Sequence, residues 1–261
     1  MRYLRLLGIF ARTELQFAME YRVNLLLDLF EEVVIVLSSL TAMLVLFSHT
    51  GVINGWTLAQ MIVLLGVYYI IQGANSVLFE ASFERFMEHV RLGTLEFILI
   101  KPANSQFLAS ARHVQVAQLG QLLLGLAMVA IGVAQIGEGV GALEGLAFVV
   151  TLACGLGLVY CLLLVLSTLA FWFVRVENLL AIFWSFVDAG RFPVDVYPGW
   201  LRITLSTVVP IGIAVTVPAE AIAGRLDTLG LVSMVAGTAL VWWFAGWFWK
   251  QGLRNYSGAS A

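Results

Sequence analysis

The feature that most constrains this chain is the length of its charge-free apolar stretches. No Asp, Glu, Lys or Arg occurs over Val33–Phe79, and the same holds for His113–Gly137, Gly145–Val174 and Thr228–Trp249. A membrane-spanning helix needs about 20 apolar residues to cross a hydrocarbon core about 30 Å thick. Only 11% of the 261 residues are charged, whereas soluble domains carry about 25%. The sequence therefore predicts an integral membrane protein.

The spans are expected to be helices in a single transmembrane domain, residues 1–261. Backbone polar groups in lipid must be satisfied within the segment, and the alternating pattern of a membrane β-barrel is absent. We therefore expect an all-α fold with six spans. Their approximate positions are 24–47, 58–79, 114–136, 145–171, from 179 to the charges at Asp188 and Arg191, and 228–249.

The N-terminal segment, residues 1–22, carries apolar residues on one helical face and charged residues on another. We expect an interfacial helix, because its four arginines would be costly in hydrocarbon. The alternative is the first turn of a longer first span.

The placement of lysine and arginine predicts the orientation. One side would carry most of them, in the N-terminal segment, the polar segment 80–112, the turn at Arg175 and the C-terminal tail. The other side would carry Arg191, Arg202 and Arg225. We therefore expect a multi-pass protein of the inner or plasma membrane with both termini in the cytosol.

The stretch RLGTLEFILIKPANSQF, within the polar segment, has the pattern of a short packed helix. Gly93 and Thr94 can start it, and Leu92, Leu95 and Leu99, joined by Ile98, would share one face. Pro102 must end it, because a residue before proline avoids helical geometry. Such a helix is marginal in water alone, so it should rest against the membrane, its own protein or a partner.

With this stretch, the six spans and the prolines before the last span, the chain resembles permeases of ABC-type exporters of the type-2 class. The closest branch carries a G-x-L-[DE]-x-x-L-x-[KR]-P cytosolic segment. The resemblance implies that the short helix is a coupling helix seated in a cleft of a nucleotide-binding subunit; the alternative is a polar loop at the membrane surface. The residues that match the motif are Gly93, Leu95, Glu96, Leu99, Lys101 and Pro102. The residues expected to couple the chain to the ATPase are Leu92, Gly93, Thr94, Leu95, Glu96, Phe97, Ile98, Leu99, Lys101, Pro102 and Arg175.

ATP hydrolysis is expected in a separate subunit. A P-loop needs a lysine followed by Ser or Thr, but Lys101 precedes Pro102 and Lys250 precedes Gln251. The chain would be a non-catalytic half-permease with no metal site and no cofactor of its own, and ATP and Mg would bind the ATPase partner. A second permease, either a copy or a relative, and membrane lipid complete the expected partners; the net charge of −2 does not suggest nucleic acid binding.

Prolines break the apolar region 192–227. We expect two half-helices that enter and leave on the external side, with their irregular backbone shielded by protein. The resemblance implies an outer gate, and the alternative is an external cap without a gating role. The candidate gate residues are Pro193, Tyr197, Pro198, Trp200, Pro210 and Pro218.

Three acids, Asp28, Glu31 and Glu32, lie near the cytosolic start of the first span. Ionisable groups at that depth are usually paired or face water. They are candidates for a vestibule on the substrate path that attracts cations. The alternative is structural pairing with Arg22, Arg112 or the interfacial helix.

The function predicted by the resemblance is export of hydrophobic, lipid-like or cationic compounds by alternating access. A secondary transporter would need an inverted repeat with paired broken helices, and only one broken region is visible. A membrane enzyme would need a catalytic cluster, which His49, His89 and His113 do not form. A non-transporting scaffold would leave the segment Gly93–Pro102 unexplained.

Overall fold

The computed structural model describes residues 2–96, 100, 104–137, 141–173 and 177–256. Over these residues the fold is helical, and an isolated bridge between Ile53 and Trp56 is the one β-pairing. The predicted all-α membrane fold is confirmed. In the part of the chain that the structure describes, five helical segments are long and apolar enough to cross a membrane: Arg22–His49, Leu58–Arg91, Val116–Ile136, Ala142–Phe171 and Thr228–Asn255.

These segments are built from the following elements. The first and last are the single helices α2 (Arg22–His49) and α12 (Thr228–Asn255). The others combine α3 (Leu58–Asn75), η1 (Ser76–Glu80) and α4 (Ala81–Arg91); η2 (Val116–Gln118) and α7 (Leu119–Ile136); and α8 (Ala142–Thr168) and η3 (Leu169–Phe171).

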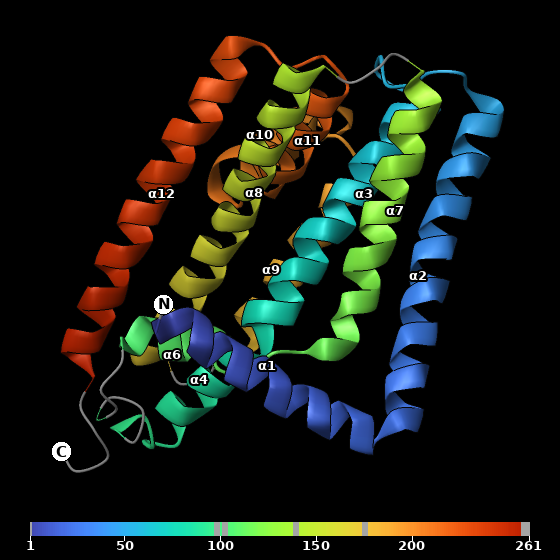
Figure 1. Ribbon diagram of the computed structural model, residues 1–261. Helices are drawn as coiled ribbons and strands as arrows, with labels where there is room; N and C mark the ends of the chain where they lie inside the picture. Colours follow the sequence, from blue (N-terminus) through green and yellow to red (C-terminus); the bar gives the residue numbers. More distant parts are fainter. Residues whose placement is uncertain (1, 97–99, 101–103, 138–140, 174–176, 257–261) are drawn as a thin grey trace.

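Two further helices lie at one end of this bundle. The helix α1 (Arg2–Glu20) crosses that end steeply inclined to the long helices (Figure 1), and its Leu7 lies near α6 (Ser105–Ala111). The last turn of α12 reaches the same end. We call it the terminal end, and we call the opposite end the far end.

The helix α3 forms the centre of the bundle because it packs backbone to backbone against α7. Gly66 of α3 faces Gly125 of α7, Gly73 of α3 packs against Leu122, and Gly132 of α7 packs against Ala59 and Val63. A Cβ added at Gly66 would lie 2.8 Å from the Gly125 carbonyl oxygen, and one at Gly125 would lie 2.8 Å from the Gly66 oxygen. Small residues at such contacts let membrane helices approach closely, and residues Met61 to Ile71 of α3 are buried.

The fifth predicted span is present as a short helix. The helix α8 ends at the terminal end and α12 begins at the far end, so the chain crosses once between them (Figure 1). The first part of this crossing is α9 (Glu177–Asp188), whose 12 residues cover only about 18 Å. The 3-10 turns η4 (Ala189–Arg191) and η5 (Val194–Val196) follow it.

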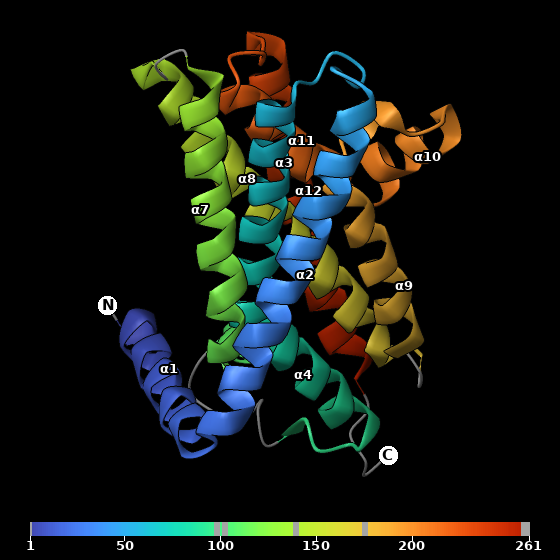
Figure 2. The ribbon, with the colours of Figure 1, turned by 90° about the vertical axis from the view of Figure 1, so that its right-hand side faces the viewer.

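A bent pair of helices fills the proline-rich region. The segment Gly199–Val208, made of α10 (Gly199–Ile203) and η6 (Thr204–Val208), meets α11 (Ile211–Ile222) at 89°. Before the pair, the Asp195 carbonyl accepts from Asn54 Nδ2 at 3.0 Å; after it, Arg225 donates to the Gly55 carbonyl at 3.0 Å. Both flanks contact one far-end turn, so the pair enters and leaves at the far end (Figure 2), as expected of half-helices.

The polar segment after the second span begins later than the charges suggest. The helix continues through the π-turn η1 into α4, which buries Phe83, Phe86 and Met87 and exposes Glu84 and Glu88. The charges after Phe79 therefore occupy the outer face of an amphipathic helix.

Candidate functional site

The segment after α4 begins with a helix stop. Gly93 has a left-handed backbone with φ +69°, its N–H donates to the Val90 carbonyl at 3.2 Å, and the Thr94 N–H donates to the His89 carbonyl at 2.9 Å. This bond pair is the Schellman motif, in which glycine is favoured because it has no Cβ. The Thr94 hydroxyl and His89 Nδ1 are 2.8 Å apart. Gly93 and Thr94 thus end α4, and helical backbone resumes at Glu96 shortly after them.

The two leucines of this stretch that the structure describes, Leu92 and Leu95, lie in opposite environments. Leu95 is only 1% exposed and belongs to the protein's own core, whereas Leu92 is 59% and Ile100 is 78% exposed. The Ile100 N–H donates to the Glu96 carbonyl at 3.1 Å, which is the spacing of an α-helical hydrogen bond. Leu95 therefore anchors the segment, and Leu92, Glu96 and Ile100 form its outward surface. Other predicted coupling residues lie outside the described residues: Phe97, Ile98, Leu99, Lys101, Pro102 and Arg175.

An aromatic junction joins three helical segments beneath this surface. The Phe86 ring of α4 lies 5.6 Å from Phe171 of η3 and 5.1 Å from Trp249 of α12, and Phe171 lies 5.9 Å from Tyr256 (centroid distances). Trp249 is buried here, whereas the neighbouring Trp242, Trp243 and Trp247 are exposed. The junction is thus the meeting point of α4, η3 and α12.

A second site, which the sequence reasoning did not select, is a polar cluster in the apolar bundle. The Tyr68 hydroxyl donates to Asp188 Oδ1 at 2.9 Å, and Arg191 Nη2 lies 3.0 Å from the same oxygen. Tyr68 is buried in α3 ten residues after Leu58, about 15 Å along the helix and so near mid-membrane. The Asp188 side chain is still 54% exposed. A buried tyrosine in a charge-free span and the Asp188–Arg191 spacing were its only sequence signals.

This cluster is joined to the bent pair. A Cβ added at Gly190 would lie 3.0 Å from Ile211 of α11 and 3.3 Å from the Tyr68 ring, so η4 packs tightly between α3 and α11. The Tyr197 hydroxyl donates to the Ala189 carbonyl at 2.7 Å.

The candidate gate residues occupy different environments. Pro193, Pro210 and Pro218 are buried, Pro198 and Trp200 are exposed, and Pro218 lies inside α11. Pro198 directly precedes α10 and Pro210 directly precedes α11.

The three acids of the first span are not gathered into one site. Asp28 and Glu31 are exposed on α2, and Asp28 lines a small hollow with α1 and η2. Glu32 points to the packed face, where its Oε2 is buried without a hydrogen-bond partner in the described part of the chain. None of the ion pairs between described residues includes these acids; nearby, Glu14 Oε1 and His113 Nδ1 share a hydrogen bond of 3.1 Å.

Comparison with known families gives one match. A family model for "ABC-2 family transporter protein" matches residues 33–260. No curated protein matches the chain.

Proposed function

The chain belongs to the ABC-2 transporter family, and on this basis we propose that it is the permease subunit of an ATP-driven exporter in the inner or plasma membrane. The family match covers all five long helices except the start of α2. The lysines lack the sequence context of a P-loop, which supports a separate ATPase that binds ATP and Mg. The basic terminal end, with both termini, would face the cytosol.

The outward surface of Leu92, Glu96 and Ile100 is the proposed docking site for the ATPase. The observation that carries this proposal is the burial of Leu95 between two exposed apolar neighbours. A segment anchored on its own core can present a rigid apolar edge, and such edges suit a groove on a partner. The aromatic junction beneath would carry motion from this surface into α4, α8 and α12.

The exposed face of α2 is the proposed contact with a second permease, either a copy or a relative. This face includes the small residues Ser38, Thr41 and Ala42 beside an open hollow. The Ser38 and Thr41 hydroxyls donate to the carbonyls of Val34 and Leu37, each at 2.7 Å, so no hydroxyl there lacks a partner. Small residues favour membrane helix association, and two permeases could alternate access by rigid-body movement.

The proposed substrate path passes the Tyr68–Asp188–Arg191 cluster and leads to the bent pair as the outer gate. Because Arg191 already pairs with Asp188, the unpaired acids Asp28 and Glu31 are better suited to attract cations at the cytosolic entrance. The largely apolar surroundings of the path suit hydrophobic or lipid-like compounds as well.

Co-purification with a co-expressed ATPase tests the docking proposal. We expect the wild type to retain the ATPase and the Leu92→Glu/Ile100→Glu variant to lose about a hundredfold or more in affinity, since two apolar contacts are each worth about 1.4 kcal/mol or more and each 1.4 kcal/mol is about tenfold. Val52→Glu, exposed in the far-end turn, is the matched control and should behave as wild type. Retention by the double variant, or a folded wild type that binds no ATPase, would contradict the proposal.

A further inference from the structure

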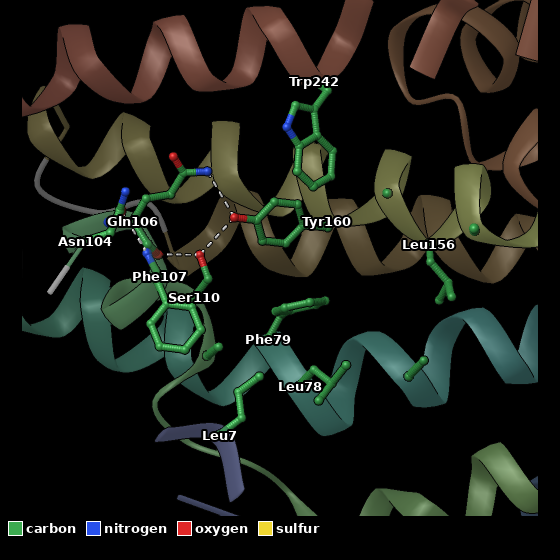
Figure 3. A pocket seen from close by; sticks show the side chains of 14 residues that line it. Leu7, Leu78, Phe79, Asn104, Gln106, Phe107, Ser110, Leu156, Tyr160 and Trp242 are labelled. Atoms are coloured by element: carbon green, nitrogen blue, oxygen red, sulfur yellow. Dashed lines mark hydrogen bonds between the residues drawn. The ribbon is translucent and has the colours of Figure 1, made fainter. Parts of the chain in front are cut away.

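A groove outside the proposed substrate path opens on the side of the bundle. It has a volume of about 640 Å³ and lies between α3, α8 and α12, with α1 and α6 at its terminal end (Figure 3). This volume is within the range of about 300–1,000 Å³ that is common for small-molecule sites. None of the described residues that line it carries a formal charge.

The groove is apolar along its length and polar at one end. Its long walls include Ala74 of α3, Leu78 and Phe79 of η1, Leu156 of α8 and Trp242 of α12. At the terminal end the Tyr160 hydroxyl accepts from Gln106 Nε2 at 3.1 Å and lies 3.1 Å from Ser110 Oγ (Figure 3). Ser110 Oγ donates to the Gln106 carbonyl at 2.7 Å, so Tyr160 donates to Ser110. One hydrogen of the Gln106 amide is left to donate to an occupant.

The depth of the groove matches one leaflet of a bilayer. On α8 the lining runs from Ala153, near the middle of the helix, to Tyr160, which is nearer its terminal end; this is about 10 Å of helix. The polar end coincides with α6 and with Leu7 of the inclined helix α1. The apolar part therefore reaches mid-membrane, and the polar part lies at the membrane surface.

We propose that this groove binds a phospholipid of the terminal-end leaflet, with one acyl chain between α3, α8 and α12 and the glycerol-ester region at Gln106, Ser110 and Tyr160. The exposed Trp242 and Ala153 leave the groove open to lipid. An uncharged polar end suits ester carbonyls and does not favour one headgroup charge.

Asn104 caps α6 by accepting from the Gln106 and Phe107 N–H groups at 2.9 and 3.3 Å, and α6 is the next helix after the docking segment. The lipid would therefore hold the end of that segment in place.

Photo-crosslinking tests this proposal independently of any ATPase. The purified protein, in phosphatidylcholine nanodiscs with a trace of diazirine-tailed phosphatidylcholine, is irradiated, and the labelled peptides are mapped by mass spectrometry. We expect labelling at Leu156 to Tyr160 and at Trp242. Gly157→Leu should reduce it by about fivefold or more, because the new side chain fills the groove.

Two variants control for folding. A Cβ at Gly157 has its nearest neighbour, Trp242, at 3.6 Å, and one at Gly145 of the same helix has none within 4 Å. Both leucine variants should therefore fold, and Gly145→Leu should be labelled as wild type. If Gly157→Leu fails to fold, Ala153→Leu replaces it with the same expected loss. Equal labelling of groove-filled and wild-type protein, or strong dependence on an anionic headgroup, would overturn the proposal.

Discussion

At the scale of single residues, Tyr68 connects three parts of the bundle. It is buried in α3, it donates to Asp188 of α9, and the Arg191 guanidinium lies 5.5 Å from its ring centroid. Charged groups at membrane depth are costly unless they are paired. Here Tyr68 and Arg191 both donate hydrogen bonds to the Asp188 carboxylate. The Tyr68 hydroxyl should therefore contribute measurably to the free energy of unfolding.

Tyr68→Phe should lower the free energy of unfolding by about 1–2 kcal/mol. Hydrogen bonds to charged groups contribute about 1.5–3 kcal/mol in general, but those between membrane helices average about 0.6 kcal/mol. Denaturant unfolding in detergent would measure the change. Tyr21→Phe, at an exposed tyrosine of the terminal end, should stay within about 0.5 kcal/mol of wild type. Equal effects at the two positions would exclude the cluster as a stabilising element.

His113 should make stability depend on pH near neutrality. Burial lowers the pKa of His113; the Glu14 hydrogen bond opposes this shift, and Arg85 and Arg112 add to it. Between the lowered folded-state pKa and the unfolded value of about 6.5, the unfolded chain binds more protons. Stability therefore rises with pH through this window and falls on acidification.

Melting temperatures at about pH 7.5 and about pH 5.5, on either side of the usual histidine pKa, test this expectation. His113→Gln should show a smaller loss on acidification than wild type. His49→Gln, at an exposed histidine near the far end, should keep the wild-type loss. An unchanged pH dependence in His113→Gln would show that another group is responsible.

At the scale of elements, the glycine contact between α3 and α7 should be the least tolerant interface. A Cβ at Gly125 would lie 2.8 Å from both the Gly66 carbonyl oxygen and the Ile70 nitrogen, so the two backbones would have to separate. Gly125→Leu should destabilise the protein by about 3 kcal/mol or more, at the upper end of overpacking costs.

The matched control is Gly237→Leu on α12, where an added Cβ has no neighbour within 4 Å. Thermal unfolding should separate the two variants clearly. A Gly125→Leu protein with the wild-type melting temperature would mean that α3 and α7 are not in backbone contact.

Sequence patterns predicted long helices well and their boundaries less well. Charge-free runs predicted the five long helices, because lipid requires both apolar side chains and internal backbone bonds. They did not predict the continuation of the second span to Arg91, since α4 carries its charges on one exposed face. Nor did they show the role of Leu95, because apolar periodicity indicates a face without saying what covers it. The Tyr68 cluster depends on contacts between distant segments, which no local pattern contains.

At the scale of the whole molecule, one continuous helical segment joins the proposed sites. Leu58–Arg91 begins at the far-end turn, holds Tyr68 near mid-membrane and ends at the Gly93 helix stop. Its π-turn, Ser76–Glu80, is of a kind often found at functional sites. Movement of the docking surface would reach the polar cluster through this segment, and the bent pair through Gly190.

The most direct test of the account is a photo-crosslinking amino acid at position 100, compared with one at position 52. In native membranes, residue 100 should form an adduct with a subunit that mass spectrometry identifies as carrying a P-loop, G-x-x-x-x-G-K-[ST], and residue 52 should not. That result would establish the docking surface and the permease role together. A folded protein that gives no such adduct at residue 100, or gives it equally at residue 52, would contradict the central claim.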